Sequence, residues 1–207
     1  MEMTTQAAPP KHSLDAAGFT LVDQQTSFLV VDKAADQNFH DEGEIGAGFF
    51  NQVQQACPNL KLYPVHRLDK MTSGLLIIAT SLDSARLFQG MFEKHEIEKY
   101  YLAISDQKPS KKQGLIKGDM ARSRRSAWKL LRSLQNPAIT QFFSYSTGTQ
   151  QRLFLLRPRT GKTHQIRVAM NSLGSPIIGD PIYHATGTSD RGYLHAYALR
   201  FTMGGCR

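Results

Sequence analysis

Residues 66–79 read HRLDKMTSGLLIIA, and the interpretation of the whole chain starts from this stretch. Asp69 lies between two cations, Arg67 and Lys70, and a turn-like Thr-Ser-Gly follows at residues 72–74. The next five residues, 75–79, form a short run that is apolar throughout, which is typical of a buried strand. The pattern therefore predicts an acid on a loop that a buried strand holds in place.

Asp69 has several chemical uses that its immediate neighbours do not separate. A carboxylate can be a nucleophile, a general base, a metal ligand or half of a structural ion pair, and the flanking cations favour its ionised form. A metal site is poorly supported, because no further acids or histidines cluster around it in the sequence. Cys57 and Cys206 are too few for a four-ligand zinc site or a disulfide scaffold. Taken alone, a loop ion pair is the commonest role for such a residue.

The charge balance points to a polyanionic partner. The 207 residues include 25 Lys and Arg but 17 Asp and Glu, which gives a formal net charge of +8. Such a surplus favours nucleic acid and, less often, an anionic membrane, while a merely basic protein is about as common. No apolar run approaches the ~20 residues of a membrane span, and the N-terminus lacks the features of a signal peptide. We therefore expect a cytoplasmic protein with no membrane partner.

Short apolar runs outnumber helical patterns, and regular helices do not separate them. This arrangement predicts an α+β fold with a mixed, largely antiparallel sheet and flanking helices. Residues 1–17 are expected to form a flexible lead-in, and residues 18–207 a single domain. Strands are expected at 19–32 (as a hairpin), 75–79, 98–104, 140–145, 152–157 and 193–201, and helices at 51–57, at 81–95 with Ser81 as cap, and at 164–173 with Gly174 as its end.

Residues 157–167, RPRTGKTHQIR, form a basic loop that runs into the third expected helix. Backbone N–H groups at a helix start, together with Lys and Arg, suit a phosphate or a carboxylate. The segment is not a P-loop, because Gly161-Lys162-Thr163 lacks the preceding Gly at the required spacing. Thr163 and Arg167 are expected on one helical face, where Arg167 could bind a carboxylate with both arms of its guanidinium. A solvated basic helix start is about as common.

Two further segments suit the binding of bases. Strand alternation in residues 98–104, EKYYLAI, sends Tyr100 and Tyr101 to opposite faces, so that one of them could stack on a base or carry a proton. Residues 108–132 interleave cations with Trp128, as a binder of phosphates and unpaired bases would. The plain alternatives are a core tyrosine and a solvated basic face. The cations of the second segment include Lys111, Lys112, Lys117, Arg122, Arg124, Arg125, Lys129 and Arg132.

Four blocks of the sequence together resemble the RluA-type family of RNA pseudouridine synthases. They are residues 66–79, residues 98–104, residues 157–184 (RPRTGKTHQIRVAMNSLGSPIIGDPIYH) and residues 193–201 (YLHAYALRF). Any one block could arise by chance, but the four occur in the family's order. The resemblance implies the catalytic fold of that family and the isomerisation of uridine in transfer or ribosomal RNA to 5-ribosyluracil. It also implies that neither a cofactor nor a metal is needed.

The resemblance also implies roles for individual residues. Asp69 would be the nucleophile, Tyr101 the active-site tyrosine and Arg167 the basic residue that pairs with the carboxylate. Arg67 would help to hold the target nucleotide out of its stack. The residues expected to bind substrate or RNA are His66, Arg67, Thr72, Lys162, Thr163, His164, Gln165, Arg122, Arg124 and Arg125.

The chain departs from the family pattern in places. Residues 32–36, DKAAD, lack the Pro and Gly of the family's Lys-Pro-x-Gly turn, and Ala169 stands where His is commoner. Little sequence precedes the catalytic blocks, so a separate S4-type RNA-binding domain is not expected, and RNA binding would fall to the catalytic domain. We expect a monomer.

Two other classes of function remain as alternatives. One is a non-catalytic RNA-binding protein or RNA chaperone, which loss of Asp69, Tyr101 or Arg167 would have favoured. The other is a phosphate-binding enzyme for small molecules, built around residues 161–163. That enzyme would bind nucleotides whether or not Asp69 is intact.

Overall fold

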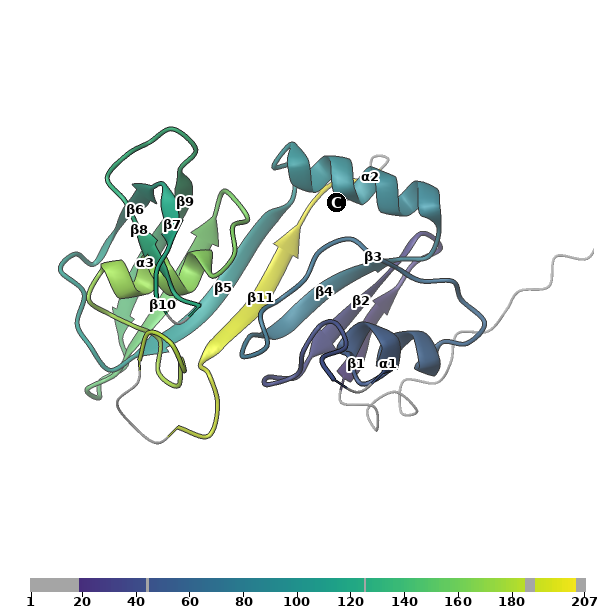
Figure 1. Ribbon diagram of the computed structural model, residues 1–207, viewed down its shortest axis with the longest axis horizontal. Coiled ribbons are helices and arrows are strands. Elements are labelled where there is room, and N and C mark those ends of the chain that lie inside the picture. Colours follow the sequence, from purple (N-terminus) through teal and green to yellow (C-terminus); the bar gives the residue numbers. More distant parts are fainter. Residues whose placement is uncertain (1–18, 44, 125, 185–188, 204–207) are drawn as a thin grey trace, which may run out of the picture.

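The main element of the protein is a nine-stranded sheet (Figure 1). The computed structural model describes residues 19–43, 45–124, 126–184 and 189–203. The sheet has the order β1-β2-β4-β11-β5-β10-β9-β6, and β3 also pairs with β4. Its strands are β1 (Phe19–Gln24), β2 (Phe28–Lys33), β3 (Tyr63–Pro64), β4 (Ser73–Ala79), β5 (Glu98–Ser105), β6 (Gln113–Gly118), β9 (Ala138–Ser146), β10 (Arg152–Pro158) and β11 (Leu194–Arg200).

A small hairpin and three helices complete the described part of the chain. The hairpin is formed by β7 (Met120–Arg122) and β8 (Trp128–Leu130), and the helices are α1 (Phe49–Ala56), α2 (Leu82–Glu93) and α3 (Gln165–Ser172). Among the described strands, β4 and β11 form the one parallel pair. The predicted α+β fold with a largely antiparallel sheet is therefore confirmed. The predicted lead-in at residues 1–17 lies outside the described residues, and the extent of the domain stays a prediction.

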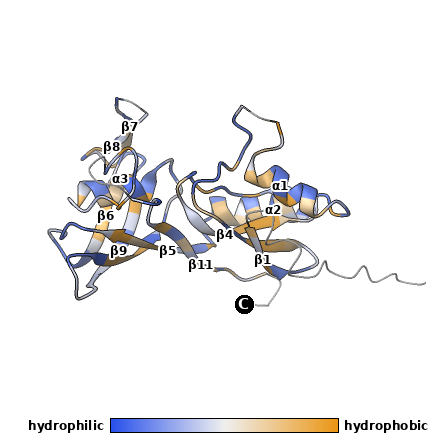
Figure 2. Cartoon of the chain, turned by 90° about the horizontal axis from the view of Figure 1, so that it is seen from below, coloured by the Kyte–Doolittle hydropathy of each residue, from blue (hydrophilic) through white to orange (hydrophobic). Residues whose placement is uncertain are grey.

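Strand β4 is apolar because it is buried on both faces. Leu76 and Ile78 pack in one core cluster with Phe49 of α1, whereas Ile77 and Ala79 pack in another with Phe88 of α2. Successive residues of a strand point to opposite faces, so the run needs no polar alternation. Figure 2 shows hydrophobic residues gathered where the sheet meets these helices. The expectation of a buried strand after Asp69 is confirmed.

Most of the expected elements are present within a few residues of their predicted ends. Ser81 caps α2 as predicted, and its hydroxyl accepts a hydrogen bond from the Ser84 amide at 3.1 Å. Helix α3 ends at Ser172, and Gly174 follows with a φ of +70°, which suits a residue just past a helix end. Strands β9 and β10 pair antiparallel, as expected.

Strands β6, β7 and β8 were not predicted within the basic segment 108–132. Strand β6 begins and ends near glycines, and Ile116 is its one buried large hydrophobic residue, so the apolar signal is weak. Residue 118 must be a glycine, because a Cβ there would lie 2.1 Å from the carbonyl oxygen of Leu131. Strand β6 is stabilised by its pairing with β9, and this pairing cannot be read from the sequence of β6 alone.

Strand β11 connects the two halves of the sheet. It pairs with β4 on one side and with β5 on the other, so β4 and β5 do not pair with each other (Figure 1). The approach of β4 to β11 is close at Gly74, where φ is +113° and a Cβ would lie 2.3 Å from the carbonyl oxygen of Ala196. Gly74 therefore lies inside the strand, and the expectation that residues 72–74 form the turn is wrong. The turn lies at residues 70–71, closed by a 2.9 Å bond from the Thr72 amide to the Asp69 carbonyl.

Candidate active site

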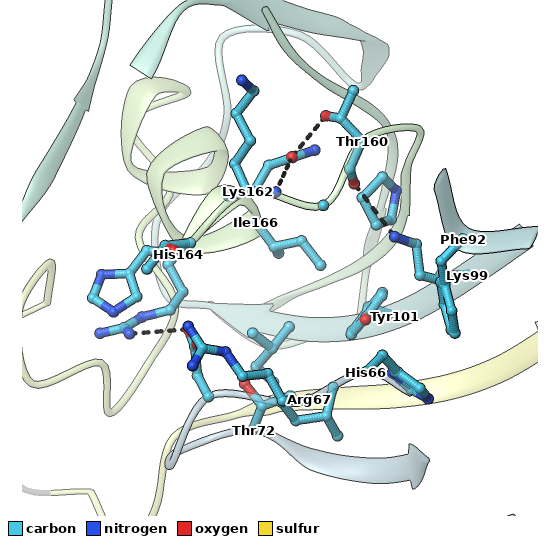
Figure 3. Close-up of a pocket in the computed structure, with 18 of the residues that line it drawn as sticks. His66, Arg67, Thr72, Phe92, Lys99, Tyr101, Thr160, Lys162, His164 and Ile166 are labelled. Carbon is cyan, nitrogen blue, oxygen red and sulfur yellow. Dashed lines mark hydrogen bonds and ion pairs between the residues drawn. The ribbon is translucent and has the colours of Figure 1, made fainter. Parts of the chain in front are cut away.

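A cavity of about 440 Å³ opens beside the β4–β11–β5 region (Figure 3). Its walls come from the loop before β4, the end of α2, strand β5, the loop after β10 and the start of α3. The structure brings together ten of the predicted site residues here. They are His66, Arg67, Asp69, Thr72, Tyr101, Lys162, Thr163, His164, Gln165 and Arg167.

Asp69, Arg167 and Asp180 form a chain of ion pairs at one end of the cavity. The Nη1 of Arg167 donates to Oδ2 of Asp69 at 3.2 Å. The other side of the guanidinium donates two hydrogen bonds to Asp180, at 2.7 and 2.8 Å. The side chain of Asp180 is fully buried and that of Arg167 is 5% exposed, whereas Asp69 is 32% exposed and can be reached from the cavity. Asp180 thus fixes the orientation of Arg167, and Arg167 presents its Nη1 to Asp69.

Arg167 and Asp180 each stabilise the charged form of the other. Burial disfavours the charged form of Arg167, but the hydrogen bonds and charge of Asp180, followed by those of Asp69, outweigh it and raise the pKa of Arg167. Burial also acts to raise the pKa of Asp180, and the hydrogen bonds and charge of Arg167 reverse this and lower it. Both groups are therefore ionised at neutral pH.

Lys33 stabilises the Asp69 loop through hydrogen bonds to backbone carbonyls. It lies at the end of β2, is fully buried, and its ammonium donates to the carbonyls of Ala34, Gln37 and Lys70 at 2.8, 2.9 and 3.2 Å. Burial lowers the pKa of Lys33 to about 8, against the opposing charges of Asp36 and Asp69. The segment that lacks the family's Pro and Gly thus still supports the loop, through a lysine that holds three carbonyls.

Tyr101 faces the cavity, and Tyr100 points to the opposite side of β5, as strand alternation predicted. The Tyr100 hydroxyl donates to Glu98 at 2.7 Å, while Tyr101 lines the cavity between two core clusters. Burial, followed by the charge of Asp69, raises the pKa of Tyr101. Its phenol is therefore protonated at neutral pH and offers an aromatic surface close to Asp69.

His66 is partly buried and has a fixed hydrogen bond. Its Nε2 accepts from the Ile77 amide of β4 at 2.9 Å, and its ring packs on Phe92 with centroids 4.7 Å apart. Burial, followed by the charge of Lys99, lowers the pKa of His66 to about 3. The ring is thus neutral at physiological pH, and it ties the start of the Asp69 loop to β4.

Gln165 holds the loop after β10 in shape. Its Oε1 accepts from the Thr160 hydroxyl at 2.7 Å and the Lys162 amide at 3.0 Å. Its Nε2 donates to the Ile139 carbonyl and the Thr140 hydroxyl of β9 at 3.0 and 3.1 Å. With both ends engaged and 5% exposure, Gln165 supports the loop that carries Lys162.

The expectation that Thr163 and Arg167 share a helical face is wrong. Helix α3 begins at Gln165, and His164 precedes it in the left-handed conformation with φ of +56°. The chain therefore turns sharply before the helix, and Thr163 lies in the loop. His164 still lines the cavity, and its Nδ1 lies 3.3 Å from the Tyr183 hydroxyl.

The cations of the basic segment lie outside the cavity lining. Arg122 and Arg124 are exposed, and the Arg122 guanidinium lies over the ring of Trp128, 5.6 Å from its centroid. Arg125 lies outside the described residues. Tyr183 links this hairpin to the site, because its hydroxyl accepts from the Trp128 amide at 2.8 Å and its ring faces the Arg167 guanidinium at 5.3 Å.

Sequence reasoning missed three site residues: Asp180, Lys33 and Lys99. Asp180 lies in the third quoted block, where the Gly-Asp-Pro turn at 179–181 marks a special backbone position but not an ion pair with a residue 13 positions away. Lys99 shares a strand face with Tyr101, and alternation alone could have placed it in the site. In the described parts of the chain, no three His, Cys, Asp or Glu side chains are grouped to hold a metal ion. None of the helices described there is long and apolar enough to cross a membrane.

Comparison with known proteins identifies the family of the chain. The family model described as RNA pseudouridylate synthase matches residues 27–172. The chain therefore belongs to this family, and it is an RluA-type RNA pseudouridine synthase, an isomerase whose substrate is RNA.

Similar proteins come from several bacteria. An uncharacterized RNA pseudouridine synthase of Haemophilus influenzae is 50% identical over 182 residues, which cover 87% of this chain and 81% of that protein. The tRNA pseudouridine synthase C of Haemophilus ducreyi is 35% identical over 167 residues, 70% of this chain and 68% of that protein. The ribosomal large subunit pseudouridine synthase D of Nitrosomonas europaea is 29% identical over an alignment of 208 residues. The alignment covers 92% of this chain and 60% of that protein.

A solved structure shows the same fold. The human RNA pseudouridylate synthase domain containing 4 superposes with a TM-score of 0.74 at 22% identity. The match covers 92% of this chain and 88% of that one.

Proposed function

We propose that this enzyme isomerises specific uridines in structured RNA, with Asp69 as the nucleophile and without a cofactor. The observation that carries the proposal is the position of the Asp69 carboxylate. It faces the cavity, is one-third exposed, and lies 3.2 Å from an Arg167 that Asp180 holds in place. A nucleophile must be accessible to the substrate and held in position, and this arrangement meets both needs.

The reaction can proceed by two routes from the same geometry. Asp69 can attack C1′ of the ribose as the C1′–N1 bond breaks, and C5 of the freed base then attacks C1′ and displaces the carboxylate. Alternatively, Asp69 can remove the C2′ proton as the C1′–N1 bond breaks, and C5 then adds to C1′ of the resulting glycal as the proton returns from Asp69 to C2′. In both routes C5 loses its proton and N1 gains one, so the product is an isomer and no external acceptor is needed.

The target uridine must leave its stack to reach Asp69. Unstacking costs a few kcal/mol, and the cost is smallest in a loop of the RNA. Tyr101 offers an aromatic surface inside the cavity, and Arg67 lies nearby in the same view (Figure 3). We infer that Tyr101 packs on the displaced base and that Arg67 helps to hold the nucleotide out of the helix.

The proposal is tested by release of tritium from RNA labelled at C5 of uridine. The substrate is labelled total RNA from cells that lack the gene for this protein. The wild-type enzyme is expected to release tritium from a small fraction of the uridines. Binding of this RNA without release would contradict the proposal and favour a non-catalytic RNA-binding role.

The RNA type is inferred from relatives. One relative is named for transfer RNA and another for the large ribosomal subunit, so both substrates are proposed here. Mapping pseudouridines in RNA from cells with and without the gene would identify the position. The monomeric state and the cytoplasmic location stay predictions.

Substituting exposed cations of the basic segment is expected to weaken RNA binding and to flatten its salt dependence. The variant replaces Lys111, Lys112, Arg122 and Arg124 with Gln. Each phosphate contact that is lost should reduce the slope of log affinity against log salt by about 0.7–0.9. Filter binding of total RNA across a salt series measures this slope.

Arg86→Gln provides the matched control, because Arg86 is an exposed cation of α2 that lies outside the basic segment. An unchanged slope in the fourfold variant would mean that the segment is only a solvated face.

A further inference from the structure

Lys99 places a weakly bonded cation in the cavity. It precedes Tyr101 by two residues on β5, so both side chains lie on one face of the strand, and both line the cavity. Its ammonium makes one hydrogen bond in the described structure, at 3.4 Å to the Thr160 carbonyl, and lies 5.9 Å from the centroid of the Phe92 ring. An ammonium has three donors, so two of them have no protein acceptor among the described residues.

The charge of Lys99 is also not neutralised. Arg167 has Asp180 and Asp69 as partners, but among the described residues no acid lies within ion-pair distance of Lys99. Burial lowers the pKa of Lys99, as expected for a cation that lacks a compensating anion. A group that is desolvated and has free donors is prepared to bind a negatively charged or strongly polar ligand atom.

Lys99 and the Asp69–Arg167 pair lie at different ends of the cavity. In Figure 3, Lys99 and Phe92 lie on one side of Tyr101, and His164, which directly precedes the helix that carries Arg167, lies on the other side. A nucleoside with its C1′ at Asp69 and its base on Tyr101 would extend toward Lys99. The edge of the base that carries the carbonyl oxygens would then face the ammonium.

We propose that Lys99 donates a hydrogen bond to a carbonyl oxygen of the displaced uracil and stabilises the negative charge that the base acquires when the C1′–N1 bond breaks. The bonding pair goes to N1 and is shared with the carbonyl oxygens of the ring. A fixed cation in a site that excludes water acts strongly on such charge. The same base anion forms in the substitution and the elimination routes, so this role does not depend on the route. The inference rests on the proposed function and adds the group that would act on the leaving base.

Three variants of Lys99 separate charge, hydrogen bonding and packing. Lys99→Met removes both the charge and the donors, Lys99→Gln keeps a neutral donor, and Lys99→Arg keeps the charge. The assay is tritium release in a single turnover with enzyme in excess, using C5-labelled total RNA from cells that lack the gene. Filter binding gives the affinity for the same RNA and its salt slope, and thermal melting reports folding.

Lys99→Met is expected to slow the single-turnover rate about 100- to 1,000-fold, as loss of one preorganised donor does in other enzymes. RNA affinity and its salt slope should stay close to the wild-type values. Lys99→Arg should recover a large part of the rate, and Lys99→Gln a small part. Lys94→Met, which alters an exposed lysine just past α2, is the control and should match the wild type.

Each other outcome overturns the inference. A weaker affinity with a shallower salt slope and an unchanged saturated rate would place Lys99 on an RNA phosphate. Equal activity of the three Lys99 variants, with a shared change in melting temperature, would mean that the residue only packs the site. If the wild type releases no tritium, the proposed function itself fails, which is a result distinct from loss in the variants alone.

Discussion

Asp69→Asn is expected to abolish isomerisation while leaving RNA affinity nearly unchanged. The amide has almost the same shape, but it cannot attack C1′ or take a proton from C2′. Loss of a nucleophile commonly costs several orders of magnitude in rate, and we expect at least about 10⁴-fold here. Single-turnover tritium release measures the rate, and filter binding measures the affinity of the same RNA.

The structure indicates why binding should survive this change. The Asp69 carboxylate makes one bond to Arg167, at 3.2 Å, and Arg167 keeps its two shorter bonds to Asp180. The Asp69 loop is held by Lys33 and by its own backbone turn, neither of which uses the carboxylate. Asp83→Asn, at a 95% exposed side chain of α2, is the matched control and should leave the rate unchanged. Turnover retained in Asp69→Asn would refute the nucleophile assignment.

Asp180→Asn is expected to destabilise the protein strongly. The change leaves Arg167 buried with a single, partly exposed acid as its partner. Breaking a buried ion pair by removal of one partner typically costs about 3–5 kcal/mol, a large part of a total stability of about 5–15 kcal/mol. Denaturant unfolding followed by circular dichroism measures the difference in the free energy of unfolding.

The pH dependence of unfolding gives an independent check on this pair. Burial alone would raise the pKa of Asp180, but the bonds and charge of Arg167 lower it from its reference value of 3.8. The stabilisation is therefore complete above that reference value and is lost as the pH falls through the lower, folded-state pKa. The free energy of unfolding of Asp180→Asn should fall less steeply in acid than that of the wild type.

The exposed pair of Asp83 and Arg86 again supplies the control. Its loss in Asp83→Asn should change stability little, because exposed ion pairs contribute little. Equal stability of Asp180→Asn and Asp83→Asn would show that the buried pair does not contribute to the fold.

The elements that sequence reasoning found are those with a strong local signal. The apolar run of β4 reflects burial between α1 and α2, and Ser81 marks the start of α2 by its capping bond. Strand β6 lacks such a signal, because Gly114 and Gly118 interrupt it and its stabilisation comes from pairing with β9. A pairing partner 20 to 30 residues away, from Gly118↔Ala138 to Gln113↔Phe143, leaves no trace in the local pattern.

The residues of the site also divide into those that have a signal in the sequence and those that do not. Asp69, Tyr101 and Arg167 were found through blocks that resemble a family, and the structure brings them into one cavity. Asp180 and Lys33 act by holding other residues, through a buried ion pair and through three carbonyls. Such support depends on tertiary contacts, so residue type and spacing alone could not reveal it. The sharp turn at His164 was missed because a left-handed histidine is uncommon outside its structural context.

The central position of β11 has a consequence for synthesis of the protein on the ribosome. Asp69 belongs to the half of the sheet that is made first, whereas Tyr101 and Arg167 belong to the half that follows, and residues 194–200 are the strand between them. The contact between Asp69 and Arg167 joins parts of the chain on either side of β11, which is the strand that both halves of the sheet share. We therefore expect a nascent chain to acquire activity only after residues 194–200 have emerged and paired with β4 and β5.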